Sequence, residues 1–211
     1  MDVLTHVALD CEDSDGGLRG HDRNDTATAT RHTVQVVSVT IRERRPADLP
    51  ALVTLLGAQQ AATSYPQRWP LPYPAEEFIV RPGELAAWVA VERDVVVGHV
   101  SITELAGGRM AIEWAQATGR SADGLAEVSV LFVAGGRGGS GIGGALLDTA
   151  LAEIRHRGLT PMLDVVGEGT SAGQFYRRRG WRTVGTARPA WLPDHRPDLA
   201  FMLLTDERVE L

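Results

Sequence analysis

Residues 126–147, AEVSVLFVAGGRGGSGIGGALL, decide the fold, because they join an apolar segment, a run of glycines and the start of a helix. The β-branched and aromatic residues of 126–133 predict a strand. The apolar spacing from 141 onward predicts an amphipathic helix that ends at Gly158. Between them, the glycines of 133–144 allow successive backbone N–H groups to converge at the positive end of the helix. This arrangement predicts a cradle for an anion, most often a pyrophosphate.

One interpretation of the glycine loop is a dinucleotide-binding fingerprint. Gly139, Gly141 and Gly144 match GxGxxG, and Asp164 follows about 20 residues later, as that fold requires. However, the fingerprint normally follows the first strand of its domain, whereas fewer than 70 residues follow the loop here. The preceding segments also predict an antiparallel meander. A dinucleotide-binding oxidoreductase is therefore the less favoured alternative.

The segments on either side of the loop predict a mixed α/β sheet. Strands are expected at VQVVSVTIR (34–42), in a hairpin over 85–105 that turns at 92–94, and at 160–166, 181–187 and 199–205. A helix is expected within residues 45–61, with Gly57 as its end. A second helix is expected at 171–179, followed by Gly180 as its stop. The four prolines of 62–78 favour a loop closed by a short helix. We expect an α/β (α+β) fold with a mixed, largely antiparallel central sheet flanked by helices.

Length and composition suit one soluble domain with a tail. The chain has 211 residues, of which 44% are hydrophobic and 23% charged. Residues 1–31 carry seven acidic residues against three arginines and few aromatics, so we expect 1–33 to form a disordered acidic N-terminal tail and 34–211 to form the domain. The single cysteine, Cys11, excludes an internal disulfide, and no apolar run reaches the ~18 residues of a membrane span. We expect a cytoplasmic protein that engages no membrane.

Charge and residue usage exclude several kinds of chemistry. The net charge of −6 disfavours binding to nucleic acid. All 21 basic residues are arginine, which excludes a Walker A loop and a lysine Schiff base. The six histidines lack the spacing of metal ligands, so no metal is expected.

Together with AGQFYRRRGW (172–181), the strand–loop–helix segment resembles the GNAT superfamily of N-acetyltransferases, which bind acetyl-CoA. Members of that family carry a strand that ends in a hydrophobic–Val pair and an (Arg/Gln)-x-x-Gly-x-(Gly/Ala) loop that opens a helix. A later short helix carries a Tyr before Gly-(Phe/Trp). The matching positions are Phe132, Val133, Gly141 and Gly143, then Phe175, Tyr176, Gly180 and Trp181. The resemblance covers about residues 34–205, with 40–56 as the first strand and helix.

The resemblance implies that acetyl-CoA is the co-substrate and that the acetyl group passes directly to an amine. It implies that the pantetheine arm lies along the strand 126–133 like an added strand, where backbone groups polarise the thioester. The implied cofactor-binding residues are Phe132, Val133, Ala134, Gly138, Gly139, Ser140, Gly141, Ile142, Gly143 and Gly144. The Arg/Gln position falls on Gly138, one residue after Arg137. Because the cradle uses backbone N–H groups, we expect pyrophosphate binding to survive; a non-catalytic acyl-CoA-binding module is an alternative.

Two residues are candidates for proton transfer. Tyr176 matches the family tyrosine near the cofactor sulfur, where a hydroxyl can protonate the leaving thiolate; the alternative is an aromatic side chain that packs the short helix. Glu127 occupies the strand position where some members carry the general base; the alternative is a solvent-exposed carboxylate at a strand end. Glu104 and Asp164 are weaker candidates. Strict strand alternation predicts two faces, Glu127, Ser129, Leu131 and Val133 against Val128, Val130 and Phe132.

The acceptor side is predicted from aromatic residues. In the resembling family the region of 62–74 lines the acceptor pocket, which here supplies Tyr65, Trp69 and Tyr73, with Trp88 and Trp114 expected nearby. Packing under the proline-rich loop is the alternative interpretation. The arginine run 177–179, together with Arg182, is expected on a solvated face, with contact to cofactor phosphates as the alternative. The expected partner is a small-molecule or peptide amine, and a homodimer is compatible with the family.

Overall fold

In the computed structural model, described for residues 38–105, 109–137 and 139–205, the central element is a seven-stranded sheet. The strands follow the order β1-β2-β3-β4-β5-β7-β6, and every neighbouring pair is antiparallel except β4 and β5. Their bounds are β1 Val39–Glu43, β2 Glu84–Glu92, β3 Val95–Glu104, β4 Leu125–Val133, β5 Thr160–Val166, β6 Arg182–Ala187 and β7 Leu199–Leu203. The mixed, largely antiparallel sheet predicted from the sequence is confirmed.

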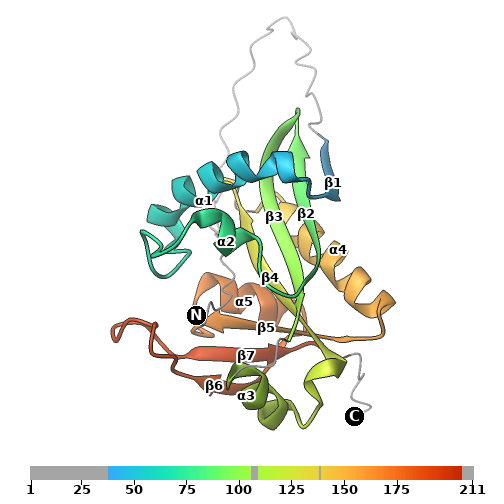
Figure 1. The fold of residues 1–211 in the computed structure, drawn as a ribbon, viewed down its shortest axis with the longest axis vertical. Coiled ribbons are helices and arrows are strands. Elements are labelled where there is room, and N and C mark those ends of the chain that lie inside the picture. Colours follow the sequence, from blue (N-terminus) through green and yellow to red (C-terminus); the bar gives the residue numbers. More distant parts are fainter. Residues whose placement is uncertain (1–37, 106–108, 138, 206–211) are drawn as a thin grey trace, which may run out of the picture.

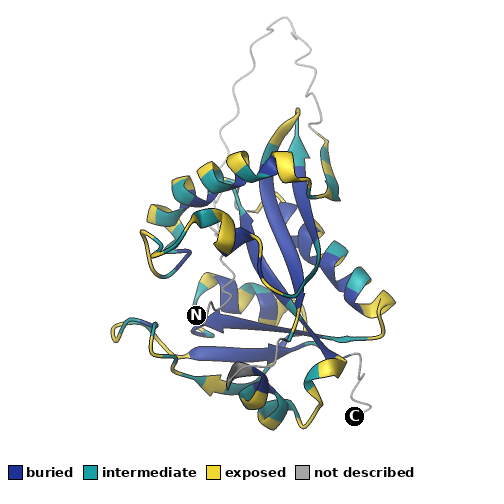
Figure 2. Cartoon of the chain, in the orientation of Figure 1, coloured by how far each residue is buried: buried dark blue, intermediate teal, exposed yellow. Residues whose placement is uncertain are grey.

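Helices cover both faces of the sheet (Figure 1). Their bounds are α1 Leu49–Thr63, α2 Ala75–Ile79, α3 Arg109–Thr118, α4 Ile142–His156 and α5 Ser171–Arg178. Apolar residues of α1 and α2 pack with Val89, Val130 and Phe132 on one face, while α4 and α5 pack on the other. Helix α3 packs near β6 and β7, where Trp114 stacks on Phe201 with 4.4 Å between ring centroids. Figure 2 shows that the central strands are buried, whereas the edge strands β1 and β6 and the outer faces of the helices are more exposed.

The hairpin of β2 and β3 turns where the sequence predicts. Arg93 and Asp94 have φ values of +49° and +63°, as a two-residue type I′ turn requires, because its twist matches that of the strands. Helix α4 likewise ends before Gly158, whose φ is +72°.

The structure corrects the end of one expected helix and adds another helix. Helix α1 does not end at Gly57 but continues to Thr63, and the ring of Trp69 comes within 3.3 Å of the position of a Cβ at Gly57. Helix α3 has no counterpart among the elements expected from the sequence. Within the described residues the first strand spans Val39–Glu43. Residues 34–37 of the expected strand, like the expected tail 1–33, lie outside the described residues.

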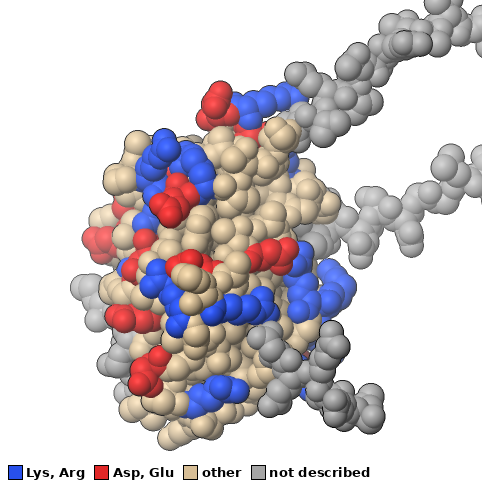
Figure 3. All heavy atoms as spheres, turned by 90° about the vertical axis from the view of Figure 1, so that its right-hand side faces the viewer, with Lys and Arg blue, Asp and Glu red and all other residues tan. Residues whose placement is uncertain are grey.

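Charged side chains are mixed on the side of the molecule drawn in Figure 3, where arginines and acidic residues lie interspersed. Several arginines of the described chain form ion pairs, among them Arg157 with Glu153 at 2.8 Å and Arg188 with Asp198 at 2.6 Å. Exposed pairs of this kind add little stability.

Candidate functional site

Strands β4 and β5 pair only at their beginnings. Their parallel register joins Leu125–Glu127 to Thr160–Met162 and goes no further, while β4 stays paired with β3 as far as Val133. In Figure 1 the later parts of β4 and β5 run in clearly different directions. Among the described residues, the edge of β4 over 128–133 therefore has no strand partner on its β5 side. We refer to residues 128–133 with 163–166 as the strand divergence.

A β-bulge at Val130 begins this divergence. Val130 has a φ of +47°, and Val100 of β3 lies opposite two residues of β4, because His99 pairs with Phe132 and Ser101 with Ser129. The predicted alternation of faces is therefore wrong. Ala126, Val128 and Leu131 pack on the α4 side, whereas Val130 and Phe132 pack under α1 and α2. Alternation before the bulge then places Glu127 and Ser129 on the side of α1 and α2.

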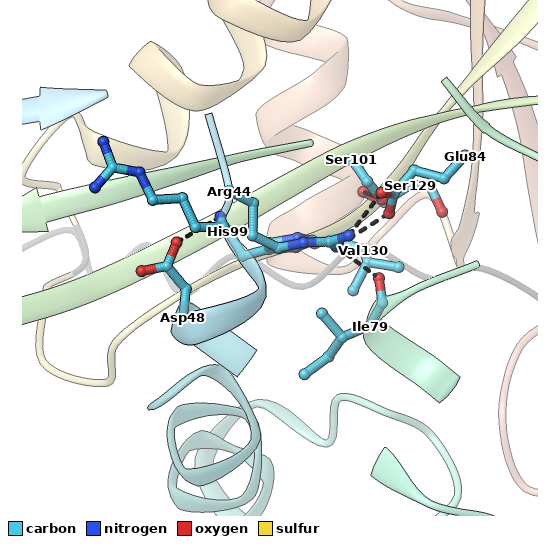
Figure 4. Close-up of polar contacts among 9 residues, drawn as sticks. Arg44, Asp48, Ile79, Glu84, His99, Ser101, Ser129 and Val130 are labelled. Atoms are coloured by element: carbon cyan, nitrogen blue, oxygen red, sulfur yellow. Dashed lines mark hydrogen bonds and ion pairs between the residues drawn. The ribbon is translucent and has the colours of Figure 1, made fainter. Parts of the chain in front are cut away.

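Side chains of β3 hold the bulge. The hydroxyl of Ser101 donates to the Ser129 carbonyl at 3.2 Å, and Nδ1 of His99 lies 2.8 Å from the Val130 carbonyl (Figure 4). Nε2 of His99 lies 3.2 Å from Nη1 of Arg44, which also forms a two-pronged ion pair with Glu84 at 2.6 and 3.0 Å. A carbonyl only accepts and an arginine only donates, so His99 carries its proton on Nδ1 and accepts at Nε2.

Burial keeps His99 neutral. The side chain is fully buried, and desolvation, aided by the charge of Arg44, lowers its pKa from 6.5 to about 3, although the hydrogen bond to Val130 and the charge of Asp48 act the other way. The sequence reasoning did not single out this residue. A lone histidine in a strand carries no spacing signal, and only its partners in three other segments reveal the network.

We expect acid to destabilise the protein through His99. Because the folded pKa lies below the unfolded value, the unfolded chain binds an additional proton between about pH 6.5 and pH 3. The free energy of unfolding should therefore fall as pH drops through this window, by up to about 1.4 kcal/mol per pH unit from this one group. Urea unfolding at pH 7.5 and pH 5.0 should show a smaller acid loss in His99→Asn than in the wild type. The exposed His156→Asn is the control, and a parallel acid loss in all three proteins would contradict the assignment.

The glycine loop leads from β4 into α4. Gly139 and Gly141 have φ values of +72° and +80°, and a Cβ at either position would meet no heavy atom within 4 Å. Gly141 is the N-cap of α4, and among the described residues no side chain caps this terminus. The first N–H groups of the 15-residue helix therefore remain open for an acceptor. Ser140 turns inward on the loop, with its hydroxyl donating to the Arg137 carbonyl at 2.6 Å. Gly138 lies outside the described residues.

One residue of the arginine run lies at this helix terminus. Arg179 is 2.9 Å from Asp148, its guanidinium lies 4.9 Å from the Phe175 ring centroid, and it occupies the space that a Cβ of Gly144 would need. Its positive charge therefore lies beside the first turns of α4. Arg177, Arg178 and Arg182 are exposed, as expected for a solvated face. Arg137 forms an ion pair with Glu92 at 2.6 Å.

Two buried tyrosines carry hydroxyl groups without a hydrogen-bond partner among the described residues. Tyr176 of α5 is fully buried and packs edge-on against Trp181, with 5.7 Å between centroids. Tyr65, also fully buried, packs against Phe78 and lies 6.5 Å from Phe132. Desolvation, with mutual repulsion between the two phenolates as a further cause, raises the pKa of Tyr176 well above 10. Burial likewise raises the pKa of Tyr65.

Carboxylates of β4 and β5 lie on the same side as Tyr65. Glu127 is half-buried and accepts from the Thr103 hydroxyl at 3.4 Å. Asp164, which sequence reasoning treated as a weaker, surface or structural candidate, is only 1% exposed. Its neighbours Leu163 and Val165 pack on the α4 side, so alternation turns Asp164 toward α1 and α2. Besides burial, the charge of Arg81 lowers the pKa of Tyr65, whereas the charges of Asp164 and Glu127 raise it. The two carboxylates and the buried Arg81 therefore all lie within electrostatic reach of the Tyr65 hydroxyl.

The predicted acceptor residues are not all together. Tyr73 packs at the edge of the cluster under α1 and α2 that contains Tyr65, and Trp69 lies over α1 and is 40% exposed. Trp88 is buried in the cluster on the α4 side, and Trp114 belongs to the cluster near α3. The structure therefore places Tyr65 and Tyr73 on the face of the sheet that carries Glu127 and Asp164, which we call the acidic side of the strand divergence. Trp88 lies on the opposite face of the sheet.

The described residues offer neither a metal cluster nor a membrane-spanning helix. No group of three or more His, Cys, Asp or Glu side chains is placed to hold a metal ion. No helix in the same residues has the length and apolar character to cross a bilayer. The antiparallel sheet, with one parallel pair, also differs from the doubly wound parallel sheet that the dinucleotide fingerprint requires.

Comparison with known proteins gives one family and one fold. The profile of the acetyltransferase (GNAT) family matches residues 56–181. No curated protein sequence matches the chain.

Solved structures of similar fold are N-acetyltransferases. Ribosomal-protein-alanine N-acetyltransferase from Brucella melitensis is 25% identical, with a TM-score of 0.58, and the match covers 78% of this chain and 98% of that one. Arabidopsis thaliana Naa50, in complex with the bisubstrate analogue CoA-Ac-MVNAL, is 19% identical, with a TM-score of 0.55 and coverage of 80% and 99%. An N-acetyltransferase from Staphylococcus aureus Mu50 is 19% identical, with a TM-score of 0.60 and coverage of 79% and 98%.

Proposed function

The chain belongs to the acetyltransferase (GNAT) family, and we propose that it transfers an acetyl group from acetyl-CoA directly to the nitrogen of an amine. One observation carries this proposal: in the described part of the chain, the edge of β4 that lacks a strand partner is followed, after the glycine loop, by the open N-terminus of α4. An acyl-CoA carries an amide-bearing arm followed by a pyrophosphate. The arm offers hydrogen-bonding groups to the β4 edge, and the pyrophosphate offers an acceptor to the N-terminus of α4. A dinucleotide has the pyrophosphate but lacks the arm.

The residues present fit acetyl-CoA in two respects. The backbone of Phe132, Val133 and Ala134 lies at the end of the unpaired edge, where an extended arm can add as a strand. Gly139 and Gly141 hold positive φ values and leave their side-chain space open, as close approach of a phosphate requires. The N–H groups of Ile142, Gly143 and Gly144 would face that phosphate. Arg179 supplies a positive charge nearby, which offsets the missing Arg/Gln side chain at Gly138.

Tyr176 suits the role of proton donor. Bound acetyl-CoA would supply an activated thioester with a sulfur leaving group. The Tyr176 hydroxyl is buried without an acceptor, which is unfavourable unless a ligand provides one. Its raised pKa keeps the proton on the oxygen at all working pH values. We therefore assign Tyr176 to donate its proton toward the leaving sulfur.

The acidic side of the strand divergence suits a positively charged acceptor. An amine with a free pKa near 10 arrives as an ammonium ion and must lose a proton before it attacks. Glu127 is assigned as the group that accepts this proton, directly or through water. Asp164 and the Tyr65 hydroxyl lie within electrostatic reach and would orient the ammonium. The acceptor is then a small-molecule or peptide amine; among the fold neighbours, one is a complex with a peptide-based analogue and another is a spermidine N-acetyltransferase.

A binding panel followed by an amine library tests this function. Acetyl-CoA should raise the melting temperature. At a concentration 100 times its dissociation constant, it should add about 2.7 kcal/mol to the free energy of unfolding. NAD(P) should leave the melting temperature unchanged. Amines should then release CoA, detected with a thiol reagent. Stabilisation by NAD(P) but not by acetyl-CoA would contradict the proposal. Tight acetyl-CoA binding without transfer to any amine would favour the non-catalytic binding module instead.

A further inference from the structure

We propose that His99 is a positioning residue that maintains the bulge of β4 for the binding of acyl-CoA. Arg44 and Glu84 hold the imidazole in place, so that its Nδ1–H donates to the Val130 carbonyl and fixes the backbone there. The inference rests on the proposed function, because it assumes that the strand divergence receives the acyl-CoA arm. Its structural half, that the network maintains the bulge, can be tested without a ligand.

At the bulge, two successive carbonyls of β4 accept hydrogen bonds from side chains of β3. Ser101 supplies its hydroxyl to the Ser129 carbonyl at 3.2 Å, and His99 supplies Nδ1–H to the Val130 carbonyl at 2.8 Å. Both donors come from β3 and both bonds are buried (Figure 4). A buried carbonyl without a donor is destabilising, so these two side-chain donors stabilise the backbone at the bulge.

The conformation at Val130 needs external support. A φ of +47° is unusual for any residue with a side chain and rare for a β-branched one, because Cβ crowds the backbone. Such strain persists only where neighbouring contacts over-determine it. Val130 is fully buried under α1 and α2, and the hydrogen bond from His99 is the polar contact that opposes relaxation of its peptide.

Relaxation of the bulge would alter the surface that acyl-CoA is proposed to meet. In a regular strand every side chain beyond Val130 would move to the opposite face, because strand alternation has a period of two. Phe132, whose ring lies 5.5 Å from that of His99 and packs under α1 and α2, would turn toward α4. The backbone groups of residues 131–133 would turn with it. The geometry of the bulge therefore decides how the β4 edge is presented.

The orientation of His99 is set from the edge of the sheet. Arg44 follows β1, and its backbone N–H donates to the Ala87 carbonyl of β2 at 2.9 Å. Its guanidinium pairs with Glu84 and contacts the Ile79 carbonyl at 3.4 Å, so it approaches Nε2 of His99 from a fixed position. This contact requires an unprotonated Nε2 and directs the single ring proton to Val130. The network thus links β1 to the site across two strands.

Four variants test the proposal. His99→Leu keeps an apolar volume but removes the donor, whereas His99→Asn retains an N–H at the position of Nδ1. Arg44→Gln breaks the ion pair that orients the ring. Arg42→Gln is the matched control, because Arg42 forms an equally two-pronged pair with Asp48 at 2.7 and 2.8 Å but does not reach His99. Calorimetry with acetyl-CoA, steady-state kinetics, and amide hydrogen exchange of residues 131–133 are the measurements.

We expect His99→Leu to weaken acetyl-CoA binding and to lower kcat, with kcat/KM reduced about 10–100-fold, the usual effect of misplacing reacting groups. His99→Asn should stay within about threefold of the wild type, Arg44→Gln should lose about three- to tenfold, and Arg42→Gln should change less than twofold. Amide exchange of residues 131–133 should quicken in His99→Leu and Arg44→Gln only. In the wild type, nitrogen-15 spectra should show a neutral imidazole with its proton on Nδ1.

The opposite results overturn the proposal and can be separated from failure of the proposed function. A folded His99→Leu with wild-type acetyl-CoA affinity and exchange rates would overturn it. If His99→Leu does not fold, equal behaviour of Arg44→Gln and Arg42→Gln would overturn it, as would a proton on Nε2. If the wild type binds no acyl-CoA, the proposed function fails. The structural half of the proposal is tested separately: if amide exchange of residues 131–133 in Arg44→Gln equals that of the wild type, the network does not maintain the bulge.

Discussion

Replacing Tyr176 by phenylalanine is expected to lower turnover about 10²–10⁴-fold, the range of a positioned acid catalyst, with little change in acetyl-CoA affinity. The ring packs edge-on against Phe175 and Trp181, and phenylalanine preserves these contacts. The hydroxyl has no hydrogen-bond partner among the described residues, so its removal should leave the free energy of unfolding unchanged or raise it by about 1 kcal/mol. Steady-state kinetics and urea unfolding of the same preparation measure both effects.

Thr183→Val is the matched control for this substitution. The Thr183 hydroxyl, on β6, is also buried without a partner among the described residues, and valine removes it with little change of shape. Both variants should unfold at equal or higher urea concentration than the wild type, but only Tyr176→Phe should lose turnover. Wild-type turnover of Tyr176→Phe on its true acceptor would remove the acid assignment and leave Tyr176 as a packing residue.

The fold was predictable because its signals are local. Alternating β-branched residues, the turn at 92–94 and the glycines at 158 and 180 each act within a few residues, and all are confirmed. The errors arise where tertiary contacts prevail. Gly57 does not end α1, because helix packing continues past it and Trp69 uses the space beside it. Helix α3 was missed because Ile112, 62% exposed, disturbs the apolar period that Trp114 follows.

The candidate site was predictable only in its backbone part. The glycine loop and the Tyr176 motif are continuous in sequence, so pattern reasoning finds them. The bulge at Val130 depends on a strained conformation that no residue type announces, and it changes the faces assigned to the residues beyond it. His99, Arg44 and Glu84 come together from separate strands, and Asp164 becomes buried through its neighbours on β7. Such features follow from the sheet order, which sequence spacing does not specify.

Replacing Gly141 by valine is expected to abolish acyl-CoA binding, with the dissociation constant raised at least about 100-fold, equivalent to about 2.7 kcal/mol. Gly141 is the N-cap of α4 with a φ of +80°, and the space at its Cβ position is open. A branched side chain there would lie where a phosphate must approach the N–H groups of the helix. The left-handed backbone should also cost about 1–3 kcal/mol of stability. Calorimetry with acetyl-CoA and thermal melting measure the two effects separately.

Gly158→Val separates the loss of binding from the backbone strain, because Gly158 lies just beyond the other end of the same helix. Its φ is +72°, and a Cβ there also meets no heavy atom within 4 Å. Both variants should therefore lose a similar amount of stability, since valine is strained in either position. Only the N-terminal end presents open N–H groups and the positive end of the helix dipole, so only Gly141→Val should lose acetyl-CoA. Equal loss of affinity in both variants would mean that strain in α4, and not blockage of the cradle, weakens binding. Unchanged affinity in Gly141→Val would refute the assignment of the glycine loop to the cofactor.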